Sequence, residues 1–510
     1  MNVLKIICAS FFILFFTFES TYSQGDTLYV NGRFLYTSAN EKVILRGVNE
    51  MFVWNSDKTG DQLLPEISQS GSNSVRLVWT HQYGRPDQLI ELIENSIGYK
   101  MIAIPECHDA TGEWDEELQA CIDFWNDPVL IEGIQRNRKW TILNIANEAG
   151  NGSISDQMFL EMYKDAITSL RSWGYTVPIM IDASIWGQNI DQIGRTAVEI
   201  LNHDPLRNVI FSTHSYWDRN STIDNYQKVV DLSEDLQVCI IVGEGPSITR
   251  FGDCEDPNPL PYLDGMQILQ EGESGWLNWS WGGQQNGDCD EYRYFDFTVN
   301  GEFANWQTIP GGMVVANDEN SIMRTSQRPE SFYENGNIDV SGVYLFAPSD
   351  TVAVGGQLIF EPLIAPVNAT NKSYSISHDD TDGLIFFDHE TNTVQGLEEG
   401  SITFTLTSND GNWIHQRKIV VYGRVTGIDN LENQFSIAPN PVLNKDLVIR
   451  MELEQSGILH LFSVTGKRLY SKKFEFSDSV QVENEQIPNG TFILQISTDK
   501  GRKVVKMYGK

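Results

Sequence analysis

The stretch Thr141-Ile142-Leu143-Asn144-Ile145-Ala146-Asn147-Glu148 decides how the rest of the chain is interpreted. It is a short apolar run that ends in an amide and a carboxylate, and Ala149-Gly150-Asn151-Gly152 follows it. Such a run is typical of a buried parallel strand whose C-terminal end opens into a loop. Because the strand ends of a (β/α)₈ barrel carry its chemistry, we expect Asn147 and Glu148 at the mouth of a barrel.

A second stretch of the same kind, Val238-Cys239-Ile240-Ile241-Val242-Gly243-Glu244, lies downstream. Two apolar strands that each end in a glutamate suggest a pair of carboxylates facing each other across one barrel. A retaining glycosidase uses such a pair of carboxylates for catalysis. Either glutamate alone is equally well explained as a solvated loop acid, so the interpretation depends on the residues that accompany the pair.

Strand signals alternate with helical segments through this part of the chain, after a small hairpin at 27–37. The expected strands are 43–49, 74–79, 101–106, 141–146, 177–182, 209–212, 238–243 and 275–281. The expected helices are 63–70, 87–97, 116–125, 155–173, 226–232 and 262–270. The alternation predicts a parallel α/β fold, and the number of strands favours a closed (β/α)₈ barrel over an open sheet. No GxGxxG or P-loop motif follows a strand, which argues against a nucleotide-binding fold.

The N-terminus and the composition indicate an exported protein. Residues 1–23 have the pattern of a secretory signal, with Lys5, an apolar run at 6–16 and the small-residue site Thr21-Tyr22-Ser23. The apolar run is too short for a confident membrane span, and no later run is long enough. The formal net charge of −33 argues against nucleic acid or anionic lipid as a partner.

Cysteine spacing gives one candidate disulfide and no zinc site. After the signal five cysteines remain, so at least one is free. Cys254 and Cys289 lie in expected loops and are candidates to pair, whereas Cys239 lies within a strand and is expected in the core. Acidic residues gather around the two loop cysteines, namely Asp253, Glu255, Asp256, Asp288, Asp290 and Glu291. Calcium is conceivable there, but no EF-hand spacing is present, and we expect solvated loops with no metal or other cofactor.

Polar and aromatic side chains gather where the expected strands end. They are Arg76, His108, Asp109, Asn147, Glu148, His214, Tyr216, Glu244, Trp279 and Trp281. Each alone is commonly a structural residue, but together they fall at one end of one barrel. In order and position, all but Asp109 and Trp281 resemble the active-site set of glycoside hydrolase family 5, a family of clan A, over roughly residues 28–317.

Several motifs resemble, more narrowly, the bacterial β-1,4-mannanases of that family. They are Arg46-Gly47-Val48-Asn49, His108-Asp109-Ala110-Thr111-Gly112, Asn144-Ile145-Ala146-Asn147-Glu148, Trp186-Gly187-Gln188 and Trp279-Ser280-Trp281-Gly282. The chain departs from those enzymes at Ala149-Gly150, where they usually have Trp, and at Gly245-Pro246, where they usually have Phe. Both positions border the sugar sites. An endo-β-1,4-glucanase or another β-glycanase therefore stays open, as does an inactive carbohydrate-binding surface protein.

The resemblance implies a retaining endo-β-1,4-mannanase that cleaves internal bonds of mannan, glucomannan or galactomannan by double displacement. Glu244 would be the nucleophile and Glu148 the acid/base, which must carry a proton to act. The resemblance, together with the aromatic content, implies a set of positioning or substrate-binding residues, namely Arg76, His108, Asn147, His214, Tyr216, Trp279, Trp281, Trp54 and Trp186. Flat sugar faces pack on tryptophan rings, but of the tryptophans at 54, 79, 114, 186 and 217 we expect about half to be structural.

The chain beyond the expected catalytic domain at 24–319 has a different pattern. Residues 320–338 are polar and are expected to be a linker, and residues 339–424 carry the short alternating strands of a β-sandwich. The sandwich resembles bacterial immunoglobulin-like modules of group 2, which are usually spacers, with carbohydrate binding around Trp413 as the alternative. Residues 425–510 resemble the C-terminal sorting domain of the type IX secretion system. This implies passage through that machinery and a secreted or cell-surface protein.

Overall fold

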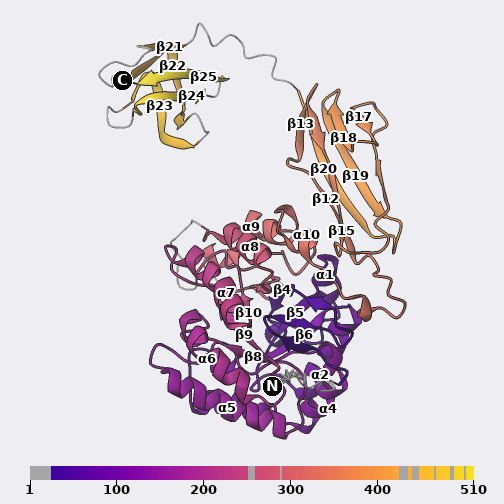
Figure 1. Cartoon of the computed structure of the whole chain (residues 1–510). Helices are drawn as coiled ribbons and strands as arrows, with labels where there is room; N and C mark the ends of the chain where they lie inside the picture. Colours follow the sequence, from indigo (N-terminus) through magenta and orange to yellow (C-terminus); the bar gives the residue numbers. More distant parts are fainter. Residues whose placement is uncertain are drawn as a thin grey trace, which may run out of the picture.

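The computed structural model describes residues 25–250, 259–287, 290–423, 435–438, 447–463, 467–482, 487–498 and 501–509. Along the chain it forms an α/β barrel, a β-sandwich and a terminal β-sheet (Figure 1). The expected signal at 1–23 lies outside the described residues. Within the described ranges, no helix is both long and apolar enough to cross a bilayer.

In the described part of the chain, eight parallel strands close into a barrel in the order β10-β11-β4-β5-β6-β7-β8-β9. They are β4 (Arg46–Glu50), β5 (Ser74–Trp79), β6 (Ile102–Cys107), β7 (Leu143–Asn144), β8 (Ile179–Asp182), β9 (Val209–His214), β10 (Cys239–Glu244) and β11 (Trp276–Asn278). Every residue in these strands is buried, which explains their continuous apolar runs. The predicted closed barrel is confirmed.

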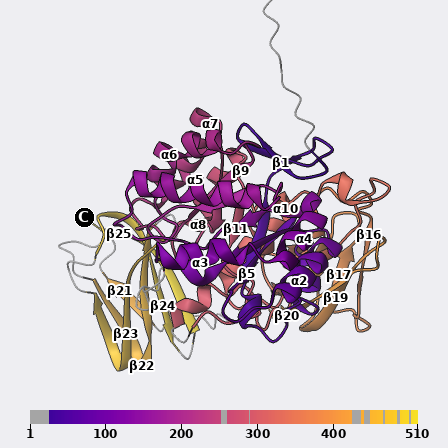
Figure 2. The same ribbon diagram turned by 90° about the horizontal axis from the view of Figure 1, so that it is seen from below.

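Helices surround the strands (Figure 2). They are α1 (Leu63–Gln69), α2 (Pro86–Gly98), α3 (Glu116–Phe124), α4 (Pro128–Arg136), α5 (Asp156–Ser172), α6 (Ile190–His203), α7 (Thr222–Leu236) and α8 (Tyr262–Glu271), with the short helices η1 (Phe52–Trp54), η2 (His108–Ala110), η3 (Arg138–Trp140) and η4 (Asp290–Tyr294). Ser155 caps α5 by accepting a hydrogen bond from the Met158 amide. Helix α6 was not predicted from the sequence, although it has a buried apolar face that includes Ile193, Ala197 and Ile200.

The N-terminal end of the barrel is closed by β1 (Tyr29–Asn31), β2 (Phe34–Tyr36) and β3 (Lys42–Val43). The segment 320–338, expected as a linker, packs on the same end and contains α10 (Ile322–Thr325) and η6 (Glu330–Phe332). Phe332 stacks on Trp140 with ring centroids 3.5 Å apart. Buried Arg328 donates hydrogen bonds to the carbonyl oxygens of Ser68 and Ser72. The segment is therefore anchored to the barrel, together with α9 (Ile309–Gly312) and η5 (Met313–Asn317) before it.

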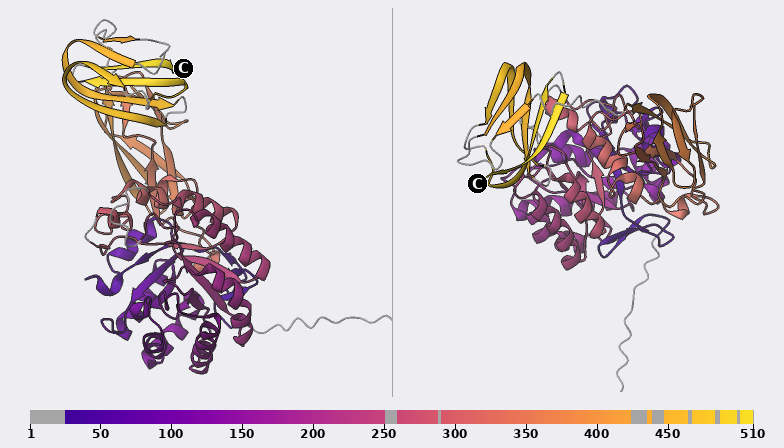
Figure 3. Two further views of the ribbon diagram at one scale, coloured as in Figure 1. Left: turned by 90° about the vertical axis from the view of Figure 1, so that its left-hand side faces the viewer. Right: turned by 90° about the horizontal axis from the view of Figure 1, so that it is seen from above.

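A β-sandwich follows the barrel (Figure 3). In one of its sheets β12 (Gly342–Phe346) pairs with β15 (Glu361–Ala365). Another has the strand order β13 (Thr351–Ala353), β20 (Ile414–Tyr422), β19 (Gly400–Ser408) and β16 (Tyr374–His378). A third has the order β14 (Gln357–Ile359), β18 (Thr393–Gly396) and β17 (Ile385–Asp388). Trp413 packs against the sandwich core and donates its indole N–H to the Val340 carbonyl oxygen at 2.7 Å. Its ring is therefore half-buried, with one edge held by the backbone.

The terminal sheet has the order β21-β22-β24-β25, with β23 paired to β22. Its strands are β21 (Phe435–Ala438), β22 (Leu447–Ser463), β23 (Arg468–Val482), β24 (Gly490–Thr498) and β25 (Gly501–Gly509). Leu459, Leu461 and Phe492 lie in its core. The two small all-β units expected after the barrel are thus present.

Candidate active site

Arg76 lies at the centre of a buried polar network inside the barrel mouth. It comes from β5, where its register partner on β4 is Asn49. Its guanidinium donates hydrogen bonds of 2.8–3.2 Å to side-chain oxygens of Asn49, Asn144, Asn147, Asp182 and Glu244. Burial lowers the pKa of Arg76, but the surrounding carboxylates outweigh burial, and the net pKa is raised. Arg76 is therefore a permanent cation that orients the side chains around it.

Glu244 ends β10 with both carboxylate oxygens held. Arg76 donates to Oε1 at 2.8 Å, and the Tyr216 hydroxyl donates to Oε2 at 2.7 Å. Burial raises the pKa of Glu244, and the charge of Glu148 adds to this effect, while His214 and Arg76 oppose it. The balance leaves the pKa of Glu244 above its ordinary value, in a fixed orientation.

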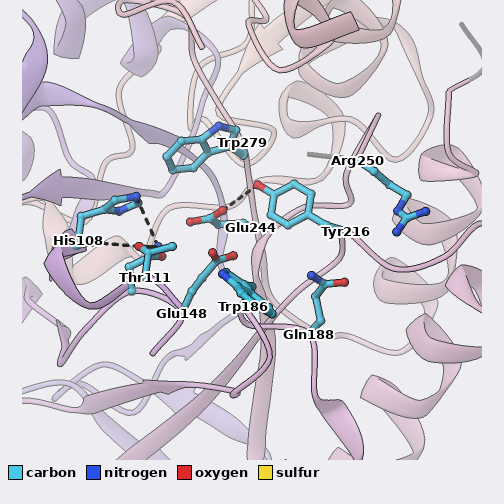
Figure 4. Close-up of a pocket in the computed structure, with 10 residues that line it drawn as sticks. His108, Thr111, Glu148, Trp186, Gln188, Tyr216, Glu244, Arg250 and Trp279 are labelled. Carbon is cyan, nitrogen blue, oxygen red and sulfur yellow. Dashed lines mark hydrogen bonds between the residues drawn. The ribbon is translucent and has the colours of Figure 1, made fainter. Parts of the chain in front are cut away.

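Glu148 follows β7 with a backbone φ of +46°, in the left-handed region. Such a conformation costs a residue other than glycine on the order of 1–3 kcal/mol, so the surrounding structure must hold it in place. Two hydrogen bonds hold it: the Glu148 amide donates to Asp182 Oδ2 at 3.2 Å, and the Gly112 amide donates to the Glu148 carbonyl oxygen at 2.9 Å. The strained turn directs the Glu148 carboxylate toward the interior of the mouth, where Figure 4 shows it beside Glu244.

His214 connects the two glutamates. Its Nδ1 lies 2.7 Å from Glu148 Oε1 and 3.5 Å from Glu244 Oε2, and its Nε2 lies 3.5 Å from Asp182 Oδ2. Burial lowers the pKa of His214, but these carboxylates raise it more strongly, to about 9. One oxygen of each glutamate and one His214 nitrogen all lie within 4.8 Å of one another. That closeness fits the separation of about 5–5.5 Å that retaining glycosidases require.

Asn147 and His108 form the side of the site toward β6. The Asn147 amide nitrogen donates to Thr111 Oγ1 at 2.8 Å and lies 3.5 Å from His108 Nε2. His108 Nδ1 lies 2.9 Å from Glu106 Oε1. Burial lowers the pKa of His108, but the charge and hydrogen bond of Glu106 and the charge of Glu244 together raise it, and the net pKa is raised. The orientation of both side chains is therefore fixed by neighbours.

These residues line a cavity of about 450 Å³ at the mouth (Figure 4). Its lining is His108, Thr111, Asn147, Glu148, Trp186, Gln188, Tyr216, Glu244, Arg250 and Trp279. Thr111 and Gln188 belong to motifs recognised in the sequence but were not selected as site residues. Arg250 lies in the loop after β10, and no sequence pattern pointed to it. Arg76 and His214 support this lining from behind, because Arg76 hydrogen-bonds to Glu244 and His214 hydrogen-bonds to Glu148.

The predicted aromatic residues divide into two groups. Trp186 and Trp54 are 46% and 42% exposed, and Trp54 lies edge-on to His108 with ring centroids 5.4 Å apart. Trp279 lines the cavity and donates its indole N–H to Asn286 Oδ1 at 2.6 Å. Trp281 is fully buried and donates to the Gly301 carbonyl oxygen at 2.8 Å, which corrects the expectation that it contacts sugar. The other mouth tryptophans, Trp79, Trp114 and Trp217, are buried as well.

A disulfide that was not predicted joins Cys107, the last residue of β6, to Cys121 in α3. Cys239 is free and buried, as expected. The candidate pair Cys254 and Cys289, and the side chains of the acidic loop residues around it, lie outside the described part of the chain.

The comparisons with known proteins cover the barrel and the terminal sheet. Residues 36–285 match the family described as "Cellulase (glycosyl hydrolase family 5)", and residues 436–508 match "Secretion system C-terminal sorting domain". The sorting domain, of type IX, indicates export, to the cell surface or the medium.

Two relatives and one solved structure illustrate the match. A mannan endo-1,4-beta-mannosidase of Salipaludibacillus agaradhaerens is 30% identical over 321 residues, covering 61% of this chain and 96% of the relative. One of Cellvibrio japonicus is 31% identical over 330 residues, covering 62% and 71%. The structure of a β-mannanase from Thermomonospora fusca is 25% identical, with a TM-score of 0.53, covering 61% of this chain and all of that one.

Proposed function

The chain belongs to glycosyl hydrolase family 5, and from this premise we propose that it is a retaining endo-β-1,4-mannanase that acts on mannan, glucomannan or galactomannan. The observation that carries the proposal is the pair Glu148 and Glu244, held within reach of one another around His214. Two carboxylates at this separation serve double displacement, in which no water needs to fit between nucleophile and sugar.

In the proposed mechanism, Glu244 attacks the anomeric carbon while Glu148 gives its proton to the leaving oxygen. The resulting glycosyl ester on Glu244 is then attacked by water, from which Glu148 takes a proton. The ester bond breaks, and both carboxyl groups return to their starting states. His214 Nδ1, 2.7 Å from Glu148 Oε1, orients the Glu148 carboxyl group for this exchange.

The neighbours of Glu244 have matching roles in this proposal. Arg76 and Tyr216 donate to the two oxygens of the nucleophile, which aligns it and stabilises the carboxylate when it leaves the sugar. Asn147 binds the sugar 2-hydroxyl through its amide, which Arg76 and Thr111 orient. Preorganised donors of this kind lower the barrier because they need no rearrangement during the reaction.

The substrate assignment is supported by the mannan-specific names of the two relatives and by the aromatic rings at the mouth. Trp279, Trp186 and Trp54 offer apolar faces to sugar rings. A β-glucanase on the same frame is the second candidate, because Ala149 and Gly245 replace aromatic residues expected of mannanases. Ala149 is fully buried, so it adds no platform next to Glu148.

We also propose that successive segments of the chain have different functions. Residues 1–23 direct export, residues 24–319 form the catalytic barrel, and residues 339–424 form an immunoglobulin-like spacer joined through 320–338. Residues 425–510 deliver the protein to the type IX secretion machinery. Trp413 is half-buried against the sandwich core with its indole N–H bonded to a backbone carbonyl, which supports a spacer over a sugar-binding module.

The test is reducing-sugar release by the mature protein on galactomannan, glucomannan and carboxymethylcellulose side by side. We expect release from both mannans. Glu148→Gln and Glu244→Gln should each lower the rate by at least about 10²–10⁴-fold while oligosaccharide binding persists. Glu132→Gln, on an exposed face of α4, is the matched control. Release only from the cellulose derivative would show that the substrate is a glucan and not a mannan. Unchanged rates in either glutamate variant would refute the mechanism.

A further inference from the structure

Four potential metal ligands meet beside the active-site mouth, outside the catalytic network. They are His81, Cys107, Asp109 and Cys121, and one ligand atom of each lies within 4.8 Å of all the others. They come from the loop after β5, the end of β6, η2 and α3. Because they are brought together only by the barrel, their spacing in the sequence does not resemble a zinc motif.

Two distances within this cluster are close to those of a tetrahedral zinc site. Cys107 Sγ lies 3.6 Å from Asp109 Oδ2 and 3.9 Å from His81 Nδ1. Around Zn²⁺ with bonds of about 2.0–2.3 Å, ligand atoms lie roughly 3.3–3.8 Å apart. Two other pairs would have to move apart. The sulfur atoms of Cys107 and Cys121 are bonded to each other and would separate on reduction. The hydrogen bond between His81 Nδ1 and Asp109 Oδ2, 2.7 Å long, would lengthen by roughly half an ångström when a metal replaces its proton.

We propose that His81, Cys107, Asp109 and Cys121 bind one Zn²⁺ when the two cysteines are thiols, so that the disulfide and the zinc site are alternative states of one cysteine pair. Two thiolates with an imidazole and a carboxylate suit zinc, whereas calcium and magnesium prefer oxygen ligands alone. Reduction by a phosphine consumes one water, yields two thiols and leaves the phosphine as its oxide. Zinc then displaces the two thiol protons.

The surroundings supply an entry path and an outer shell. The His81 side chain is 31% exposed, so an ion can reach the cluster from solvent, while Asp109 is 6% exposed and both cysteines are buried. The His81 backbone amide donates to Asp109 Oδ2 at 2.7 Å and holds the carboxylate toward the cluster. Such outer contacts fix the orientation of a ligand before the metal arrives.

The cluster lies where it can hold the end of β6 against α3. Cys107 directly precedes His108, which lines the cavity, and Cys121 lies in α3. Either the disulfide or the metal would therefore fix this strand end against α3. The cysteines of an exported chain begin as thiols and meet an oxidising environment later, so the proposed zinc state belongs to folded protein that is not yet crosslinked.

The experiment uses the full-length mature protein carrying Cys239→Ser, Cys254→Ser and Cys289→Ser, which leaves only the one pair. The folded protein is divided in two, and one half is reduced with a phosphine. Both halves are titrated with Zn²⁺ and, separately, with Co²⁺. We expect one equivalent of zinc in the reduced half, none in the oxidised half, and a thiolate-to-cobalt charge-transfer band with tetrahedral character. His81→Gln and Asp109→Asn should each weaken zinc binding by at least about tenfold.

Those two variants retain both cysteines, so each folds with its disulfide and is reduced afterwards, with circular dichroism as the check on its fold. Reduced, folded protein that binds no zinc would overturn the proposal. So would His81→Gln and Asp109→Asn variants that bind zinc as tightly as the parent, because the cysteines alone would then explain the metal. The readouts are metal content and spectrum, so the outcome is independent of the proposed hydrolytic function.

Discussion

His214 Nδ1 lies 2.7 Å from Glu148 Oε1 and 3.5 Å from Glu244 Oε2, so a single buried imidazole touches both carboxylates of the proposed catalytic pair. Whenever both glutamates are ionised, as they are once Glu148 has given up its proton, they repel one another, and an imidazolium between them offsets the repulsion. The charge of His214 is therefore part of the site's electrostatic balance, and its titration should be visible in both stability and activity.

The pH dependence of stability should report this histidine. The pKa of His214 in the folded protein, about 9, lies above the ordinary value of 6.5. Its protonation therefore stabilises the fold fully below about pH 6.5, and this contribution is lost as the pH rises from about 6.5 to about 9. Calorimetry across this window should show a steeper fall in Tm for the parent protein than for His214→Gln. Parallel curves would contradict the assignment.

Tyr216→Phe should lower activity without unfolding the protein. The change removes one hydrogen bond to the charged Glu244, worth about 1.5–3 kcal/mol, which corresponds to a loss of roughly 10- to 150-fold in kcat/KM. Because that donor favours the carboxylate, its loss raises the pKa of Glu244, and the acid limb of the kcat/KM profile should move to higher pH. An unshifted acid limb would show that Tyr216 does not act on Glu244.

Arg76→Met should cost both activity and stability. Arg76 is the buried partner of Glu244 and Asp182, and removing one member of a buried ion pair typically costs about 3–5 kcal/mol. Chemical denaturation and hydrolysis assays measure the two effects. Arg85→Met is the control, since Arg85 pairs with Asp87 on the fully exposed surface, where water screens the pair, and should leave stability nearly unchanged. Equal effects of the two variants would count against the network.

Asn286→Ala should impair substrate binding by releasing Trp279. Asn286 accepts the Trp279 indole N–H at 2.6 Å and donates to Asp296 Oδ1 at 2.7 Å, which fixes the ring at the cavity wall. We expect KM for mannan oligosaccharides to rise several-fold with a smaller change in kcat, since the carboxylates are untouched. Asn371→Ala, in an exposed loop of the β-sandwich, is the comparison variant. A fall in kcat alone would argue that Trp279 does not position substrate.

Two tryptophan variants should separate sugar binding from packing. Trp186→Ala removes an exposed ring at the cavity, so oligosaccharide affinity should fall while the free energy of unfolding is unchanged. Trp281→Ala empties a fully buried site and should destabilise the protein by about 3–5 kcal/mol. Isothermal titration and denaturant unfolding give the two quantities. Weaker sugar binding by a stably folded Trp281→Ala would show that Trp281 contributes to the sugar site as well as to the core.

The barrel and the centre of its site were predictable because strand ends leave a local signature. β5 occupies the predicted 74–79, and Glu148 and Glu244 follow apolar runs that end abruptly. The Cys107–Cys121 bond was not predictable, since the two residues meet only when α3 packs on β6. Trp281 was misassigned because it lies two residues from Trp279, yet the chain turns one indole to the cavity and the other to the core.

The central claim is tested most directly by following the hydrolysis of mannohexaose with the mature protein by proton NMR. Cleavage in which the new reducing ends appear first as the β-anomer, and only later equilibrate with the α-anomer, is the predicted result. Initial formation of the α-anomer would contradict the retaining pair of Glu148 and Glu244, and absence of cleavage would contradict the assignment to mannan.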